Sequence, residues 1–119
     1  MTHAYAYLRT SAAASPAAHR HLTQQHTQIQ NYAAQHGYHI VAIFEDRCSA
    51  TEDFRPALDA LQAATEAGLN PVIIACDRSR FFRNPIDFGE FDEWRTAFGA
   101  TLLLVSPPET LQVMENIAC

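Results

Sequence analysis

The stretch AYAYLRTS, residues 4–11, joins a strand-forming run to three polar residues. Its apolar part predicts a central β-strand over residues 4–8, and its polar end predicts a loop over residues 9–11. In open α/β sheets, ligands bind in the crevice beyond the carboxyl ends of the strands. Ser11 beside Arg9 is therefore a candidate nucleophile with its own anion-binding group.

Three further strand-like runs alternate with three segments of helical periodicity. The expected strands cover residues 38–44, 71–76 and 101–105. The expected helices begin at Pro16, Pro56 and Pro85 and end near Gly37, Gly68 and Gly99. This alternation predicts a three-layer α/β domain with helices on both faces of a mostly parallel sheet of four to five strands. The run at 38–44 is apolar enough for a strand that is covered on both faces.

The first and third expected helices each have an apolar face. The face of the first consists of Ala18, Leu22, Ile29 and Ala33. Gln25 falls on the same face, either as a polar residue at the boundary of the core or as an amide turned inward to order the loop after the first strand. The buried side of the third helix is expected to contain Phe88, Phe91, Trp94 and Phe98.

The composition fits one globular domain, with 119 residues of which 48% are hydrophobic and 18% charged. No apolar run approaches the roughly 18 residues of a membrane span. A signal peptide is not evident, so we expect a cytoplasmic protein without membrane contact. Cys48, Cys76 and Cys119 lack metal-ligand spacing, so we expect reduced thiols, no metal and no other cofactor. Residues 109–119 have the spacing of a short helix or of the start of a longer one.

The positive charge consists of eight arginines and no lysine, within a formal net charge of −5. Six of these arginines follow expected strands: Arg9, Arg47, Arg55, Arg78, Arg80 and Arg83. This distribution fits either general surface exposure or an anion site at the sheet edge, because arginine binds phosphate bidentately. The chain has no glycine-rich phosphate loop and no acidic cluster suited to two metals. The residues therefore favour a metal-free phosphoryl transfer through a covalent serine, although no histidine base for Ser11 is evident.

Four motifs, in order along the chain, resemble those of the serine recombinases, the resolvase/invertase family. The YLRTS segment, residues 7–11, resembles the Y-x-R-x-S opening of the family, and Gln25 matches the glutamine of its first helix. The D-x-x-S-G…R-P segment is matched by Asp46, Ser49, Arg55 and Pro56. The D-R-L-S-R-N segment is matched by Arg80, Phe81, Arg83 and Asn84. The resemblance covers roughly residues 4–107.

The resemblance implies that residues 1–119 are the catalytic domain of a site-specific DNA recombinase that needs no metal and no nucleotide. Ser11 would attack a DNA phosphodiester and form a 5′-phosphoserine intermediate. The phosphate would be surrounded by Arg9, Arg80 and Arg83. The loops would be positioned, and binding assisted, by Gln25, Asp46, Ser49 and Arg55.

Serine recombinases act as homodimers that pair into tetramers and exchange DNA strands by subunit rotation. In the family, the catalytic domain is followed by a long dimerisation helix and a separate DNA-binding domain. We expect both to be absent or truncated here, because residues 109–119 lie about where that helix would begin. The acidic balance agrees, so this segment alone is expected to bind DNA weakly.

Three positions depart from the family pattern. Ala50 replaces the glycine after Ser49, Ser79 replaces an aspartate that would orient Arg80, and Phe82 replaces a small polar residue. One alternative is therefore a catalytically silent recombinase-like module that serves oligomerisation or regulation. Another is an unrelated α/β protein whose arginine-rich edge binds a phosphorylated metabolite.

Overall fold

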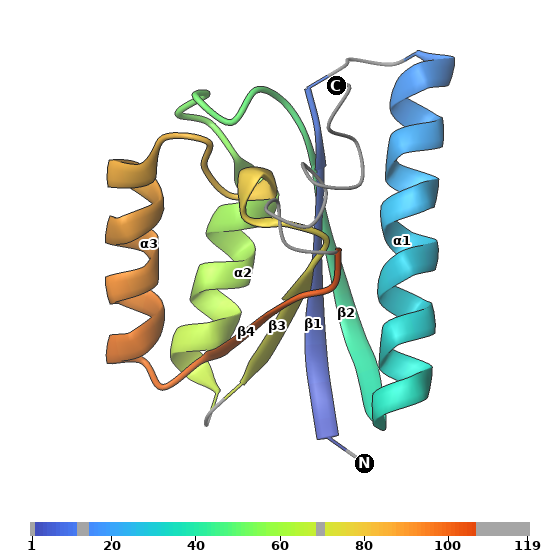
Figure 1. Cartoon of the computed structure of the whole chain (residues 1–119). Coiled ribbons are helices and arrows are strands. Elements are labelled where there is room, and N and C mark those ends of the chain that lie inside the picture. The colour runs from blue at the N-terminus through green and yellow to red at the C-terminus, as the bar shows by residue number, and fades with distance from the viewer. Residues whose placement is uncertain (1, 12–14, 69–70, 107–119) are drawn as a thin grey trace, which may run out of the picture.

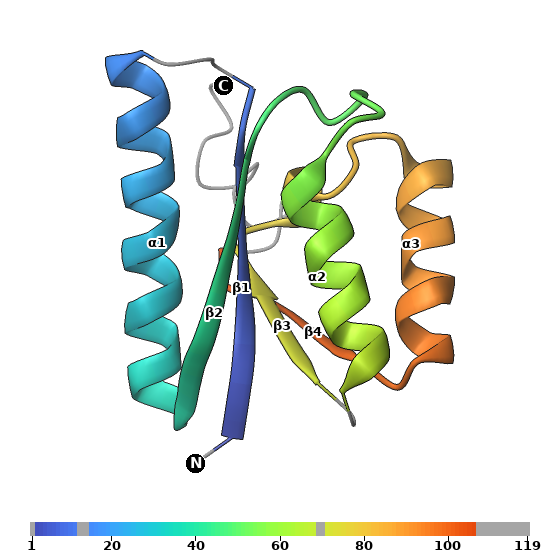
Figure 2. The ribbon, with the colours of Figure 1, turned by 180° about the vertical axis from the view of Figure 1, so that it is seen from behind.

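The computed structural model describes residues 2–11, 15–68 and 71–106, so the helix expected within residues 109–119 lies outside the described part. The elements are β1 (Thr2–Thr10), α1 (Pro16–His36), β2 (Tyr38–Arg47), α2 (Pro56–Ala67), β3 (Val72–Ala75), the 3₁₀ turn η1 (Arg78–Arg80), α3 (Pro85–Ala97) and β4 (Thr101–Leu104). The described strands form one parallel sheet in the order β2-β1-β3-β4. Helix α1 covers one face, while α2 and α3 lie on the other (Figures 1 and 2). The predicted three-layer α/β fold is confirmed, with four strands in this part of the chain.

The helix ends depend on local signals that the sequence contains. The Ser15 side chain accepts a hydrogen bond from the amide of Ala18 at 3.0 Å, and Pro16 opens α1. At the other end, Gly37 has a φ of 76°, a left-handed conformation that glycine adopts without steric cost. Asn84 caps α3 by accepting from the amide of Ile86 at 2.7 Å. None of the helices in the described ranges is long and apolar enough to cross a membrane.

Each face of the sheet buries an apolar cluster. The cluster beneath α1 includes Ala4, Ala6 and Leu8 of β1 with Leu22 and Ile29 of α1. The cluster beneath α2 and α3 includes Tyr7, Leu61, Ile73, Phe81 and Phe91. Side chains alternate between faces along a strand, so Arg9 leaves β1 on the same side as Tyr7. This alternation directs the Arg9 side chain toward the α2 side of the domain.

Strands β1 and β2 both extend beyond their predicted ends. Arg9 and Thr10, which were expected in a loop, pair with Asp46 and Arg47 in the parallel ladder. Main-chain hydrogen bonds hold this extension, so it needs no apolar side chains and gives no hydrophobic signal. The candidate nucleophile Ser11 consequently lies directly after the last paired residue of the central strand.

The expectation that residues 38–44 are covered on both faces is wrong. Strand β2 lies at the edge of the sheet, and Val41 and Ile43 are each 45% exposed. The apolar content of the run reflects strand propensity, which does not distinguish an edge strand from a central one. Phe98 is also not buried: α3 ends at Ala97, and Phe98 beyond it is 44% exposed.

The pairing of β2 with β1 shifts by one residue at Val41. Ala4 pairs with Ile40, whereas Tyr5 pairs with Ala42. Ile40 packs in the cluster beneath α1, and Phe44 packs in the cluster beneath α2. The extra residue therefore reverses the alternation of β2, as β-bulges do, and directs the following side chains to the α2 side.

Candidate active site

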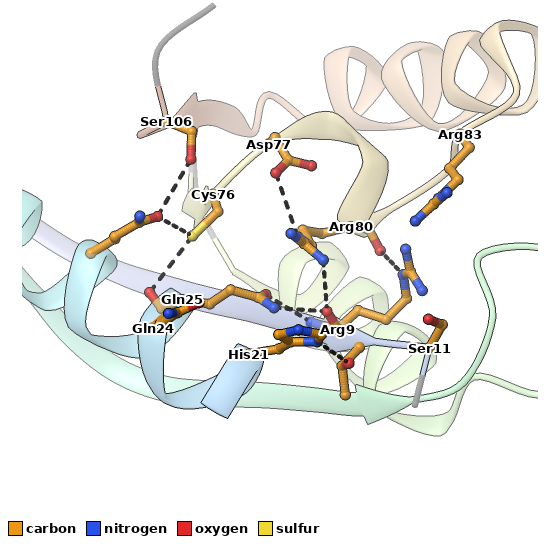
Figure 3. Close-up of a pocket in the computed structure, with 12 residues that line it drawn as sticks. Arg9, Ser11, His21, Gln24, Gln25, Cys76, Asp77, Arg80, Arg83 and Ser106 are labelled. Atoms are coloured by element: carbon orange, nitrogen blue, oxygen red, sulfur yellow. Dashed lines mark hydrogen bonds and ion pairs between the residues drawn. The ribbon is translucent and has the colours of Figure 1, made fainter. Parts of the chain in front are cut away.

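A cavity of about 330 Å³ lies at the carboxyl edge of the sheet. The four residues predicted to be catalytic all line it, namely Arg9, Ser11, Arg80 and Arg83, together with Gln25 (Figure 3). They come from the end of β1, from α1, from η1 and from the loop before α3. The structure therefore gathers the candidate nucleophile and three arginines from distant parts of the chain around a single space.

Gln25 is turned inward, as one of its two interpretations expected. Its side chain is buried, its Oε1 accepts from the Arg9 amide at 3.0 Å, and its Nε2 donates to the Arg9 carbonyl at 2.8 Å. A carboxamide can do both because it has a donor and an acceptor side by side. The two bonds attach α1 to the end of β1, two residues before Ser11.

The Arg9 guanidinium holds main-chain carbonyl groups in this structure. It is 1% exposed, and it donates to the carbonyl groups of Arg80 at 2.9 Å, Cys48 at 2.8 Å and Ser79 at 2.8 Å. Burial, followed by the positive charges of Arg55 and Arg80, lowers the pKa of Arg9. Three of its five N–H donors join the loop after β2 to η1, so Arg9 organises two loops as well as lining the cavity.

Arg55 forms a second set of contacts to η1 from the start of α2. It is 2% exposed, and it donates to the carbonyl groups of Arg80 at 2.7 Å and of Phe81. Its Nη2 also donates to the Tyr7 hydroxyl at 2.8 Å. The guanidinium lies 5.0 Å from the ring centroid of Phe82, within cation–π range. Phe82 thus contributes an aromatic contact to the buried Arg55 side chain.

Asp46 connects Tyr7 to the N-terminus of α2. Its Oδ2 accepts from the Tyr7 hydroxyl at 2.8 Å and from the Leu58 amide at 2.9 Å, while its Oδ1 accepts from the Ala57 amide at 2.9 Å. A carboxylate at this position satisfies free amides and interacts favourably with the helix dipole. Burial is the main cause that raises the pKa of Tyr7, against the opposing charge of Arg55. The hydroxyl therefore remains a proton donor to Asp46.

Arg80 and Arg83 differ in how firmly they are held. Arg80 is half-buried, with its Nε 3.5 Å from Asp77 Oδ2 and its Nη1 donating to the Arg9 carbonyl at 3.2 Å. Arg83 is exposed and points toward the cavity in Figure 3. Ser11 is exposed as well, so its hydroxyl is accessible to a ligand that enters from solvent.

Other predicted residues lie outside the cavity. Asp46 and Arg55 are buried beneath the loops, where they hold main-chain groups rather than line the space. Ser49 is exposed, and its hydroxyl pairs with the hydroxyl and the amide of Thr51. Arg47 forms an exposed ion pair with Glu45 at 3.6 Å. The structure therefore separates the predicted site into a cavity and a supporting network behind it.

Among the cavity residues that the sequence did not single out, His21 and Asp77 each contact another residue of the site. His21 lines the cavity, and its Nδ1 lies 3.2 Å from the Thr10 hydroxyl. It lies one helical turn before Gln25 on α1, so the inward position of Gln25 was the available signal. Asp77 also lines the cavity, beside Arg80. Its position depends on the tight 3₁₀ turn that follows it, for which the sequence has no strong pattern.

The fold and the site together define a class: a parallel three-layer α/β domain with an exposed serine and guanidinium groups around one cavity at its carboxyl edge. The profile of the family described as "Resolvase, N terminal domain" matches residues 4–118. The chain belongs to this family, that of the serine recombinase catalytic domains. No curated protein sequence is a significant match.

Solved structures of serine recombinases have the same fold. The C-terminal catalytic domain of ISC1926 TnpA, an IS607-like serine recombinase, is 23% identical over 98% of this chain and 78% of that chain, with a TM-score of 0.74. A resolvase family site-specific recombinase from Streptococcus pneumoniae is 19% identical over 99% and 86%, with a TM-score of 0.75. The N-terminal catalytic domain of TP901-1 integrase is 18% identical over 87% and 77%, with a TM-score of 0.73.

Proposed function

We propose that this domain cleaves and rejoins DNA by phosphoryl transfer, with Ser11 as the nucleophile. The observation that supports this most directly is the cavity shared by Ser11, Arg80 and Arg83. An exposed hydroxyl beside guanidinium groups can attack a bound phosphodiester while the charge that develops on the phosphate oxygens is stabilised. Family membership makes DNA the expected source of that phosphodiester.

In the proposed cleavage step, Ser11 Oγ forms a bond to phosphorus and loses its proton to solvent. The bond between phosphorus and the 3′ oxygen of the preceding nucleotide breaks, and that oxygen takes up a proton. The products are a 5′-phosphoserine link and a free 3′ hydroxyl. The reverse reaction, with a 3′ hydroxyl from another strand, rejoins DNA and uses the bond energy stored in the serine ester.

The residues around Ser11 have distinct proposed roles. Arg80 and Arg83 bind the phosphate from η1 and from the loop before α3. Arg9 contributes to the same anion site while it holds the two loops through their carbonyl groups. Gln25, Asp46 and Arg55 position these loops, and Ser49 assists binding from the loop after β2. These roles extend to homodimers and tetramers, in which cut strands would be exchanged between subunits.

The test joins the chain to a heterologous DNA-binding module and supplies DNA with two sites for that module. A nicked substrate, from which the cut end diffuses away, should accumulate a covalent protein–DNA adduct that survives denaturing electrophoresis. Ser11→Ala should abolish the adduct and keep the circular dichroism spectrum of the wild type. Substituting Thr23, an exposed residue of α1, with alanine is a control that should leave the adduct unchanged. An adduct from Ser11→Ala would show that another residue is the nucleophile.

A second candidate function is a catalytically silent module for oligomerisation or regulation. The observation that favours it is the use of Arg9 and Arg55 to hold main-chain carbonyl groups. Guanidinium groups committed in this way have fewer donors for a phosphate. If the fused wild-type domain binds the two-site DNA as an oligomer and forms no adduct at any concentration tested, the silent module is the better description.

A further inference from the structure

The Arg80 guanidinium is oriented from two sides. Its buried Nε makes no hydrogen bond but lies 3.5 Å from Asp77 Oδ2, within ion-pair distance, and its Nη1 donates to the Arg9 carbonyl at 3.2 Å, as the dashed lines of Figure 3 indicate. The Arg80 and Asp77 side chains are only 26% and 35% exposed, respectively, and both residues line the cavity that contains Ser11. The charge of Asp77 on one side and the hydrogen bond to a carbonyl on the other favour one position of this guanidinium.

The Asp77 carboxylate is itself held by the turn that carries Arg80. The Ser79 hydroxyl donates to Asp77 Oδ1, and the Arg80 amide donates to the Asp77 carbonyl at 3.2 Å. The one-turn helix η1 places residues three apart on the same side, so Asp77 faces Arg80. Ser79 thus stands directly before Arg80 in the sequence, and its hydroxyl group holds the carboxylate of Asp77.

We propose that Asp77 is the positioning residue of Arg80, and that Asp77 and Ser79 together replace a carboxylate located directly before Arg80. The inference rests on the proposed phosphoryl transfer, because it assigns Asp77 a function through the arginine that binds the phosphate. A partly exposed ion pair contributes at most about 1 kcal/mol to folding. The effect of Asp77 is therefore on the orientation of Arg80 in the reaction rather than on the stability of the domain.

A relocated carboxylate tests this assignment. The variants are D77N, which keeps the size of the side chain and removes its charge, and D77N/S79D, which moves the charge to position 79. The matched control is D92N, since Asp92 forms an (i,i+3) ion pair with Arg95 on α3, at 2.6 Å, and does not line the cavity. Each variant is fused to the same DNA-binding module, and the rate of adduct formation is measured at saturating DNA.

We expect D77N to form the adduct about 100-fold more slowly, because a misplaced binding group costs roughly this much. D77N/S79D should recover at least about a tenth of the wild-type rate. D92N should react at the wild-type rate, and all the variants should keep the melting temperature of the wild type within about 3 °C. A wild-type rate for D77N would overturn the inference. A double variant as slow as D77N would also overturn it, since the carboxylate would not be replaceable from position 79.

A spectroscopic readout separates this inference from the proposed function. The ¹⁵Nε–H signal of Arg80, assigned with R80K, should have a similar chemical shift in the wild type and in D77N/S79D and a different one in D77N, because its charged neighbour is lost. If the wild-type domain forms no adduct and this pattern holds, the proposed function fails while the positioning by Asp77 stands. If the signal is the same in all three proteins, Asp77 does not orient Arg80, whatever the activity.

Discussion

The side chain of Gln25 and the main chain of Arg9 are bonded to each other in both directions. The amide of Arg9 donates to Gln25 Oε1 at 3.0 Å, and Gln25 Nε2 donates to the carbonyl of Arg9 at 2.8 Å. This carbonyl also accepts from Arg80 Nη1 at 3.2 Å. One main-chain residue therefore connects α1, β1 and η1 immediately before the candidate nucleophile Ser11.

Substituting Gln25 with glutamate should destabilise the domain by about 1–3 kcal/mol, because a carboxylate cannot donate to the Arg9 carbonyl and would be buried beside it. Urea unfolding of Gln25→Glu, followed by circular dichroism, measures this change. Gln24→Glu is the matched control, since Gln24 is the exposed neighbour on the same helix. Equal unfolding free energies for the two variants would contradict a structural role for the buried amide.

Substituting Arg9 with lysine should cost about 2–4 kcal/mol of stability even though the charge is kept. An ammonium group cannot reach the carbonyl groups of Cys48, Ser79 and Arg80 together, so at least one buried acceptor would lose its partner. Arg20→Lys, on the exposed surface of α1, should change stability by less than about 0.5 kcal/mol. Thermal unfolding of both variants decides the point, and an Arg9→Lys domain as stable as the wild type would argue against this role.

Removing the Tyr7 hydroxyl should destabilise the domain by about 1–3 kcal/mol, because Asp46 loses a donor and Arg55 loses an acceptor in a buried site. Tyr5→Phe is the control, on the same face of β1 but only partly buried. Chemical denaturation of Tyr7→Phe and Tyr5→Phe gives the comparison. If both phenylalanine variants had the unfolding free energy of the wild type, the hydrogen bonds of Tyr7 to Asp46 and Arg55 would contribute nothing to stability.

Much of the architecture could be predicted because the relevant signals are local. Short-range hydrogen bonds to the side chains of Ser15 and Asn84 begin two helices, and backbone sterics favour glycine at the left-handed position 37. Gln25 could be singled out because the local helical periodicity places this polar residue on an apolar helix face. The convergence of Arg9, Arg80 and Arg83 on one cavity followed from the rule that parallel strands end on one edge.

The parts that could not be predicted depend on contacts between distant segments. Nothing in residues 7–11 indicates that the Arg9 guanidinium meets carbonyl groups from two later loops. The partnership of Asp77 with Arg80 depends on a 3₁₀ turn whose residues have no distinctive pattern. The edge position of β2 is a property of strand order, which an apolar run does not encode.

The Cys76 thiol should make stability depend on pH above neutrality. Burial is the main cause that raises the pKa of Cys76 from 9.0 to about 11. The unfolded chain therefore loses this proton first, and the stabilisation is fully present below pH 9 and is lost as the pH rises toward 11. The slope reaches at most about 1.4 kcal/mol per pH unit.

The comparison that isolates this effect is the unfolding free energy of wild type minus that of Cys76→Ala, measured under reducing conditions from pH 8 to 10.5. Other groups titrate in both proteins and cancel in the difference. The difference should be constant up to about pH 9 and should then decrease. A difference that stays constant over the whole range would mean that the buried thiol titrates as it does in the unfolded chain.

The unpaired Val41 has a consequence for how relatives of this domain are aligned and redesigned. Because the extra residue changes the parity of β2, Ile40 and Phe44 face opposite sides of the sheet although they are four residues apart. A relative that lacks this one residue can keep a regular alternation and still direct its counterpart of Asp46 toward Tyr7 and the start of α2. An alignment with such a relative therefore needs its gap at Val41, because a gap placed elsewhere in residues 38–45 would match residues that face opposite sides of the sheet.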